Sequence, residues 1–470
     1  MYRFPSDRFL LLALALTLGL SLLRLDRQPI AEWDEARVGI NAVEIWRTGD
    51  WINPYFAGKP DAWVAKPPLN TWLVALALRF FGYEPFFLRL PALLANLLTV
   101  FFLFRLIALY RSPRFALLAV LLLLSVKGFL GIHVGRTGDP DALLLALLTG
   151  ATFFLVRAVS FERRADWWWM GLLWGLAFWT KGPAAGVLAP GWFLFIVLQG
   201  KVKQILANRA FWLGMAAFLA LAAGWLGLAT RFGLESPEPI FAGRNALERM
   251  LSYDLWQRFS ESNFEQPQHP SRFTFFFIYL DAHFNVWNYA LFGAVLGGLY
   301  LWLIRKWQWW REEPLLLLSV ACWASLGGLL SLAATTHRWY MAPVLPYLAI
   351  TTAYGLWWAG RRAVWSRAAI GALLLFTLGR HAWQLAHPGP PPIEVATIVP
   401  RIQEVTEVYI VPPFPKQDLL LYLYLARPDL RFVEGIGELP PGAQVLLSVA
   451  PLNWEVLEKT ANLTFARKPR

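Results

Sequence analysis

The chain has 470 residues, of which 57% are hydrophobic, 16% aromatic and only 16% charged, and 26 are tryptophan. Soluble globular domains carry roughly 25% charged residues, so this composition excludes an ordinary water-soluble enzyme and indicates an integral membrane protein. Lysine and arginine outnumber aspartate and glutamate by 43 to 31. In a membrane protein such an excess reflects cytoplasmic loops, so we infer no nucleic-acid partner.

A helix that crosses the bilayer needs about 20 apolar residues. The first such run, Phe9 to Leu23, follows two arginines and is read as an uncleaved helix rather than a signal peptide, because many further spans follow it. The sequence predicts about eleven spans, which begin near residues 9, 88, 115, 139, 167, 183, 210, 285, 314, 340 and 363.

Clustered arginine and lysine mark every second connection as cytoplasmic by the positive-inside rule. These clusters fall in residues 3–8, 105–114, 157–164, 201–209, 305–311 and 361–367. The N-terminus is therefore expected in the cytoplasm, and the alternate loops outside it. The apolar stretch Pro67 to Phe81 would invert this orientation if it were a span, so it is predicted to be a short re-entrant or interfacial helix at the outer face.

The chain changes character at Pro388-Gly389-Pro390-Pro391-Pro392, a stiff linker that stops the last helix. Beyond it, Glu407 to Val411 and Gln444 to Val449 are predicted strands, and Gln417 to Ala426 is a predicted helix. We therefore expect an all-α polytopic membrane domain over residues 1–387. A small extracytoplasmic α/β domain is expected over residues 388–470.

Acidic residues lie at the outer ends of two predicted spans. Asp34 and Glu35 follow the first span directly. A carboxylate at the boundary of water and lipid can have a raised pKa and act as a general base, although a solvated helix-capping acid would look the same. Asp139 and Asp141 form an Asp-x-Asp pair before another span. That pattern suggests metal ligation, although Asp139 also fits an N-cap.

Cations lie at the same predicted face. Lys66 begins the predicted interfacial helix, where it suits either a phosphate or lipid headgroups. Lys181 separates two apolar runs, so it lies at the surface or faces an aqueous cavity that holds an anion. The remaining candidates in the outer loops are Arg258, His269, His337 and Tyr340. Acids and cations gathered beside lipid fit an enzyme that uses a lipid-linked phosphate.

The order of short motifs resembles a known family. The motifs are Asp34-Glu35-Ala36-Arg37, Gly49-Asp50-Trp51, Lys66-Pro67-Pro68-Leu69, Arg89-Leu90-Pro91, Arg136-Thr137-Gly138-Asp139-Pro140-Asp141, Thr180-Lys181-Gly182-Pro183 and Tyr340 with Pro343. Over roughly residues 5 to 350 this series looks like the bacterial relatives of protein O-mannosyltransferases and of the aminoarabinose transferase that acts on lipid A. Each motif is loose, but their number and order are distinctive.

The resemblance implies a GT-C fold in the plasma or inner membrane and a sugar donor linked to polyprenyl phosphate. Transfer would invert the anomeric carbon and deliver the sugar to a cell-envelope acceptor on the extracytoplasmic face. By motif position, Asp34 would be the catalytic carboxylate, with Asp141 or Asp139 as the second acid of the cavity. The donor phosphate would meet Lys66, Lys181, Arg37 and Arg258. The donor and acceptor site would also include Glu35, Tyr340, His269 and His337.

Two departures from the family pattern leave questions open. Ala65 stands where aminoarabinose transferases usually have glutamate, so a metal site that uses this glutamate is in doubt, and the metal requirement stays open. Residues 254–259 lack the histidine that often precedes Arg258-Phe259. The chain also carries no β-trefoil insertion, which disfavours protein O-mannosylation. A transporter or flippase of lipid-linked sugars is the alternative class, although such proteins often show broken helices in matched halves.

Overall fold

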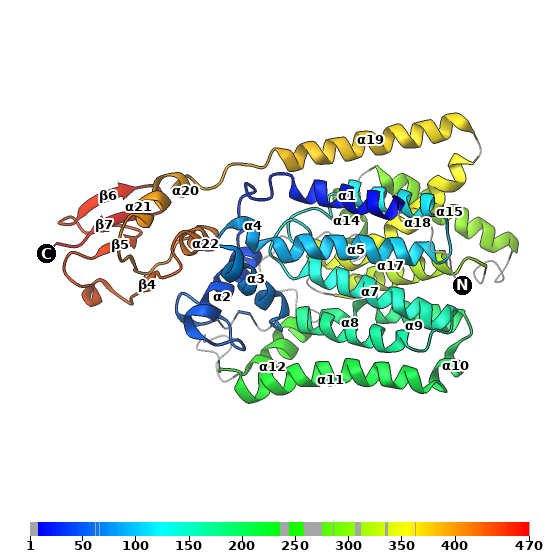
Figure 1. Cartoon of the computed structure of the whole chain (residues 1–470), viewed down its shortest axis with the longest axis horizontal. Coiled ribbons are helices and arrows are strands. Elements are labelled where there is room, and N and C mark those ends of the chain that lie inside the picture. The colour runs from blue at the N-terminus through cyan, green and yellow to red at the C-terminus, as the bar shows by residue number, and fades with distance from the viewer. Residues whose placement is uncertain are drawn as a thin grey trace.

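The computed structural model describes residues 8–61, 63–64, 66–235, 244–257, 275–284, 286–305, 312–333, 337–361 and 363–469. Among the described residues, apolar helices form a bundle at one end of the elongated molecule (Figure 1), and eleven of them correspond to the predicted spans. They are α1 (Arg8–Leu22), α5 (Leu90–Ala108), α6 (Pro113–Ser125), α7 (Asp141–Ser160), α8 (Asp166–Lys181), α9 (Ala189–Leu198), α11 (Arg209–Phe232), α15 (Trp287–Arg305), α17 (Pro314–Leu332), α18 (Leu345–Gly360) and α19 (Val364–Ala386).

Each predicted span has a helix at or near its expected start, but not every helix is long enough to cross a bilayer by itself. Within the described ranges, six stretches of at least 18 residues have the required length and apolar composition. One of them, Asp166–Leu198, joins α8 and α9 through η1 (Gly182–Leu188). Lys201 after α9 contacts Glu162 before α8 at 3.3 Å, so the chain reverses between these helices. The chain is a membrane protein, and its exact number of spans stays a prediction.

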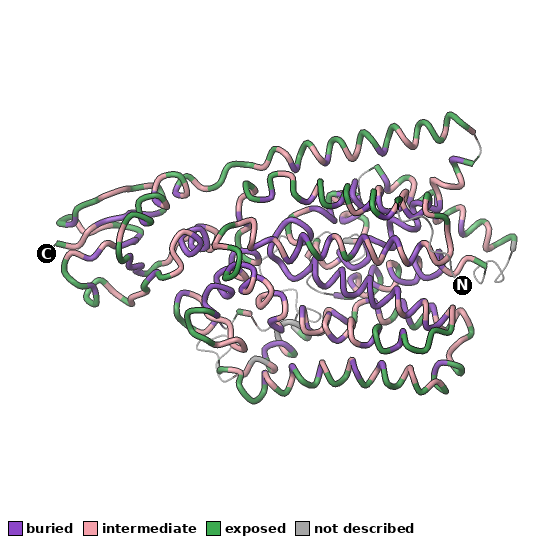
Figure 2. The backbone as a smooth tube through the Cα atoms, viewed as in Figure 1, coloured by how far each residue is buried: buried purple, intermediate pink, exposed green. Residues whose placement is uncertain are grey.

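Helix α7 lies at the centre of the bundle, packed between α5 and α8, and most of its residues are buried. Figure 2 shows this burial along the central helices, whereas α11 and α19 at the periphery are largely exposed. Exposed side chains on α11 include Trp212, Leu213 and Leu219. Large apolar side chains on an outer helix face are what a surrounding bilayer requires.

Short elements lie between the bundle and the far end of the molecule. These are α2 (Asp34–Thr48), β1 (Tyr55–Phe56), β2 (Lys59–Pro60), α3 (Leu69–Phe81) and α4 (Pro85–Leu88). Others in the connections are α10 (Val202–Leu206), α12 (Ala246–Arg249), η3 (Met250–Gln257), α14 (Phe275–Phe284) and η5 (Arg338–Val344). A helix is present at the position of the predicted re-entrant or interfacial helix as α3, and its 13 residues are too few to span a bilayer. Its location at the membrane surface stays a prediction.

The C-terminal region contains a five-stranded sheet with the order β4-β3-β5-β7-β6. Its elements are α20 (Ile393–Thr397), α21 (Val399–Gln403), β3 (Tyr409–Ile410), α22 (Gln417–Ala426), β4 (Arg431–Phe432), η6 (Ile436–Glu438), β5 (Gln444–Leu447), β6 (Glu455–Lys459) and β7 (Thr464–Arg467). Strand β3 pairs in parallel with β4 and β5, whereas β7 pairs antiparallel with β5 and β6. The predicted helix and two predicted strands are therefore present, and three further strands complete the sheet.

One apolar core joins the C-terminal region to the N-terminal part of the chain. Buried residues of α2 and α3, such as Ile40 and Val74, belong to the same cluster as Leu420 and Leu423 of α22. The bundle has its own separate core around α7. The C-terminal sheet is thus attached to the short helices α2 and α3 through this shared core.

Candidate active site

A buried ion pair fixes the start of α2. Glu35 has no exposed surface and accepts hydrogen bonds from Nε and Nη2 of Arg89, at 2.6 and 3.0 Å. It also accepts from the backbone N–H groups of Ala31 and Gly138, so all of its partners are internal. Its carboxylate therefore holds α2, α5 and the segment before α7 together, and its predicted contact with donor or acceptor stays a prediction. The neighbouring residue, Asp34, remains one-third exposed.

The segment between α6 and α7 is irregular, buried and held by side-chain amides. Asn96 of α5 donates to the carbonyl of Gly135, and Asn70 of α3 donates to the carbonyl of Gly138, both at 2.8 Å. Within the segment, the hydroxyl of Thr137 accepts from the N–H of His133 and donates to Asp139. These bonds fix the imidazole of His133 and the carboxylate of Asp139 beside each other.

Four charged or titratable side chains meet at this point. Nδ1 of His133 lies 3.6 Å from Asp34 and 3.4 Å from Asp139. Nζ of Lys66 lies 3.6 Å from the other oxygen of Asp34. Two other parts of the chain, one with Lys66 and one with His133 and Asp139, therefore converge on Asp34.

A second ion pair lies next to the first group. Nζ of Lys181, at the end of α8, donates to both carboxylate oxygens of Asp141 at 2.6 and 2.7 Å. The same ammonium lies 5.6 Å from the ring centroid of Tyr340, a distance typical of a cation–π contact. This ion pair joins the start of α7 to the end of α8.

Aromatic rings of η5 connect the two groups. Trp339 stacks on His133 with ring centroids 3.9 Å apart, and its ring also lies near those of His337 at 4.6 Å and Tyr340 at 6.2 Å. The ammonium of Lys181 in turn lies over the ring of Tyr340. Asp34, Lys66, His133, Asp139, Asp141 and Lys181 therefore belong to one continuous site at the end of the bundle that faces the C-terminal sheet.

The environment shifts two pKa values. Burial lowers the pKa of His133, but the contact with Asp139 and the charges of Asp34 and Asp141 outweigh it, so the pKa lies above its usual value. Burial raises the pKa of Asp139, and the charge of Asp34 adds to this effect, while His133 opposes it. Perturbed pKa values of this kind concentrate at functional sites.

The other predicted site residues are Arg37, Arg258 and His269. Arg37 donates from Nε and Nη2 to both oxygens of Asp61 at 2.7 Å, and its guanidinium lies over the ring of Phe56. It thereby organises the loop after α2. Arg258 and His269 lie outside the described residues, and their predicted roles stay predictions.

The sequence analysis missed His133. It stands in an irregular stretch directly before the Arg136-Thr137-Gly138-Asp139 motif, and its φ of 66° lies in the left-handed region that side chains rarely adopt. The sequence did offer one indication of a site at His133: it is a lone histidine in an apolar stretch, close to the Asp139-Pro140-Asp141 pair. Its link to Asp34 depends on tertiary structure and has no signature in the sequence.

Three of these residues fit a divalent cation. One ligand atom from each of Asp34, His133 and Asp139 lies within 4.8 Å of the others. Oδ1 of Asp139 is buried without a hydrogen-bond partner in the described part of the chain. Two carboxylates and an imidazole suit Mn²⁺ or Zn²⁺. This group does not use position 65, where the family's glutamate is absent.

Comparison with known sequences gives a consistent result. The profile of the dolichyl-phosphate-mannose-protein mannosyltransferase family matches residues 65–227. The undecaprenyl phosphate-alpha-4-amino-4-deoxy-L-arabinose arabinosyl transferase of Aeromonas salmonicida is 28% identical over 347 residues, which cover 67% of this chain and 57% of that protein. The enzyme of the same name from Pseudomonas savastanoi is 31% identical over 158 residues, 33% of this chain and 29% of that protein. The matches thus span little more than half of these relatives at most.

Solved structures match over a longer range. ArnT from Cupriavidus metallidurans bound to undecaprenyl phosphate aligns with a TM-score of 0.66 over 98% of both chains, at 16% identity. The oligosaccharyltransferase AglB from Archaeoglobus fulgidus, in complex with an inhibitory peptide and a dolichol-phosphate, aligns with a TM-score of 0.59 over 91% of this chain and 64% of that one, at 13% identity. The resemblance found in the motifs is confirmed: the chain is related in sequence to the aminoarabinose and dolichyl-phosphate-mannose-dependent transferases and has the GT-C fold of ArnT.

Proposed function

We propose that the chain is an integral-membrane glycosyltransferase that moves a sugar from a polyprenyl-phosphate donor to an extracytoplasmic lipid, glycan or protein acceptor. The observation that carries this proposal is the continuous site in which Asp34 lies beside Lys66 and His133, with the Lys181–Asp141 pair next to it. A carboxylate near two lysines is what a reaction with a nucleophilic hydroxyl and a phosphate leaving group requires.

The names of the related proteins support the donor class. The curated relatives are arabinosyl transferases named for undecaprenyl phosphate. The two solved structures of this fold hold undecaprenyl phosphate and dolichol-phosphate respectively. We therefore propose a long polyprenyl phosphate as the carrier, with its chain among the apolar helices.

Asp34 is proposed as the general base. Its carboxylate is partly exposed, unlike that of Glu35 beside it, so an acceptor can reach it. It would take the proton of the acceptor hydroxyl while that oxygen attacks the anomeric carbon, which inverts the configuration. The bond between the sugar and the phosphate oxygen breaks, and its electron pair leaves with the polyprenyl phosphate.

Lys66 and Lys181 are proposed to hold the phosphate that departs. Their ammonium groups now contact Asp34 and Asp141, and an incoming phosphate would compete with these carboxylates. Fixed cations at a site with little water stabilise developing negative charge, and loss of one such contact typically costs roughly 3 to 4 kcal/mol. A cation bound by Asp34, His133 and Asp139 would add further positive charge at the same place.

The positive-inside rule supports an extracytoplasmic site in the plasma or inner membrane. The connections at the opposite end of the bundle carry the arginine clusters, such as residues 105–114 and 157–164. The candidate site and the C-terminal α/β region lie at the other end (Figure 1). The N-terminus would then be cytoplasmic and the C-terminal domain external.

Transfer by the purified protein tests this proposal. Asp34→Asn is expected to abolish transfer of label from a panel of radiolabelled polyprenyl-phosphate sugars to cell-envelope extract, while binding of polyprenyl phosphate is retained. Asp26→Asn is the matched control, because Asp26 is an exposed carboxylate at the same end of α1 that pairs only with Arg27 among the described residues. Full transfer by Asp34→Asn would exclude Asp34 as the base. No transfer by the wild type, with donor binding intact, would favour the transporter alternative.

A further inference from the structure

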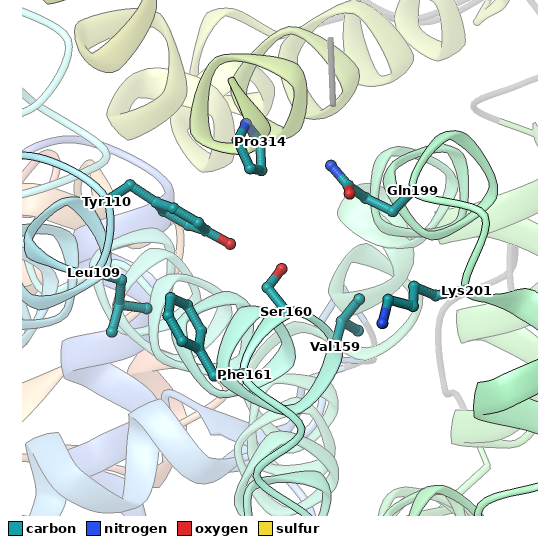
Figure 3. Close-up of a pocket in the computed structure, with 8 residues that line it drawn as sticks. All are labelled: Leu109, Tyr110, Val159, Ser160, Phe161, Gln199, Lys201 and Pro314. Carbon is teal, nitrogen blue, oxygen red and sulfur yellow. The ribbon is translucent and has the colours of Figure 1, made fainter. Parts of the chain in front are cut away.

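A cavity of about 380 Å³ lies at the end of the bundle opposite the candidate site. It is half-open and lies where four helices meet, at the ends of α5, α7 and α9 and the start of α17. The described residues that line it are Leu109, Tyr110, Val159, Ser160, Phe161, Gln199, Lys201 and Pro314 (Figure 3). None of these lining residues belongs to the motifs by which the sequence resembles the transferase family.

The polar groups of this cavity are all able to donate hydrogen bonds. Figure 3 shows the hydroxyls of Tyr110 and Ser160 and the amide of Gln199 directed toward a common space. Nε2 of Gln199 is buried and has no hydrogen-bond acceptor among the described residues. No carboxylate is among the described lining residues. Several donors without an opposing acid form a setting for an anion.

Positive charge is available at the rim. Lys201 lines the cavity, and its ammonium contacts Glu162 at 3.3 Å in a pair in which both side chains are at least one-third exposed. Exposed pairs of this kind contribute between about 0 and 1 kcal/mol, so the lysine can turn to another anion at little cost. The surrounding connections also carry Arg105, Arg111, Arg114, Arg163, Arg164 and Lys203, which outnumber their acids Glu162, Glu312 and Glu313. This excess of positive charge favours a negatively charged ligand.

The other lining residues are apolar. Leu109, Val159, Phe161 and Pro314 lie between the polar groups around the cavity (Figure 3). A free inorganic anion would gain nothing from these apolar side chains, whereas a phosphate attached to a glycerol and acyl chains would contact them as well as the polar groups. Basic pockets between membrane helices on the cytoplasmic side commonly bind lipid headgroups.

We propose that this cavity binds the phosphodiester headgroup of an anionic lipid of the cytoplasmic leaflet. The phosphate would accept from Tyr110, Ser160 and Gln199, and the ammonium of Lys201 would neutralise it. The lipid would connect four helix ends, α5, α7, α9 and α17, which continue to the candidate site at the opposite face. Binding here does not depend on the proposed transferase reaction.

Native mass spectrometry of the intact protein in detergent, with phosphatidylglycerol or phosphatidylcholine added, tests the proposal. We expect the wild type to bind phosphatidylglycerol at least tenfold more tightly than phosphatidylcholine. Gln199→Leu keeps the side-chain volume and removes the donor, so it should lose most of this preference. Gln204→Leu is the matched control. Gln204 of α10 lies at the same end of the bundle and contacts Glu162, but it is not among the residues that line the cavity.

Two further measurements complete the test. Ser160→Trp fills the cavity and should also remove the preference, provided that its thermal denaturation matches the wild type. Inorganic phosphate at millimolar concentration should not displace the lipid. Equal affinity for both lipids, or equal effects of Gln199→Leu and Gln204→Leu, would overturn the proposal. Displacement by inorganic phosphate would identify a soluble phosphate compound as the ligand and would overturn the lipid assignment.

Discussion

The backbone N–H of Ile30 donates a hydrogen bond of 3.0 Å to the phenol oxygen of Tyr422, which lies 392 residues further along the chain. Ile30 is four residues before Asp34, and Tyr422 belongs to α22 of the C-terminal region. At the other end of α2, Tyr424 donates to Glu44. The C-terminal region thus holds both ends of the helix that begins with the proposed base.

Tyr422→Phe is expected to lower transfer activity while donor binding changes little. The substitution leaves the N–H of the buried Ile30 without its acceptor, which typically costs roughly 1 to 3 kcal/mol, and it loosens the segment that positions Asp34. The measurement is kcat and KM for the donor, together with thermal denaturation. Tyr409→Phe is the control, because the Tyr409 hydroxyl bonds only Glu407 within the C-terminal region, as far as described. Equal activity of the two variants would contradict the positioning role.

Glu35→Gln is expected to destabilise the protein by roughly 3 to 5 kcal/mol. The substitution leaves the guanidinium of Arg89 fully buried without a counter-charge, and the new amide also faces N–H donors. Glu32→Gln is the control, because Glu32 is exposed two residues before Asp34. Thermal denaturation in detergent is the measurement. A Glu35→Gln protein as stable as the control would show that the ion pair contributes no net stability.

Gly171→Ala is expected to separate α8 from α11 and to lower stability. A Cβ on Gly171 would lie 1.9 Å from the carbonyl oxygen of Gly214, and backbone atoms of α11 cannot turn away as a side chain can. Overpacking costs about 1 to 3 kcal/mol, and small residues are the usual means of close helix contact in membranes. Gly227→Ala is the matched control on α11, because its Cβ would meet no atom within 4 Å. Thermal denaturation should separate the two variants; equal midpoints would contradict the close contact.

Helix positions follow closely from the sequence, because apolar runs and their boundaries are local properties. The helix expected at Gln417 to Ala426 is found with those bounds as α22. The strands β4, β6 and β7 were not predicted, although β4 has two residues like the predicted β3 and β7 is as continuously buried as the predicted β5, so length and burial pattern alone do not distinguish them. Their pairing is decided by the sheet, not by local pattern.

The candidate site was predictable only in part. Asp34, Lys66 and Lys181 were identified from their place at the outer ends of apolar runs, and all three lie in the site. Glu35 could not be separated from Asp34 by sequence, because its buried role depends on Arg89, 54 residues away. Geometry of that kind is set by tertiary packing.

Acid sensitivity of the C-terminal region is expected to depend on Glu394. Its buried carboxylate accepts hydrogen bonds of 3.0 Å from Thr460 and Asn462, in the turn between β6 and β7. Burial raises the pKa of Glu394, but these bonds and its own backbone N–H outweigh burial and hold the pKa below the ordinary value of 4.5. A group with a lowered folded-state pKa stabilises the protein above its unfolded-state pKa, and this contribution is lost as the pH falls through the folded-state value.

Glu394→Gln should therefore lower the free energy of unfolding by roughly 1 to 2 kcal/mol at neutral pH. The difference between wild type and variant should shrink as the pH falls below 4.5, because the protonated wild-type carboxyl resembles the amide. Thermal denaturation in detergent from pH 7 to pH 3.5 measures this difference. Glu404→Gln, at an exposed glutamate of the same region, should show no such trend. A Glu394→Gln difference that grows on acidification would mean that the carboxylate pKa is raised in the folded state, which would contradict the hydrogen-bonded arrangement.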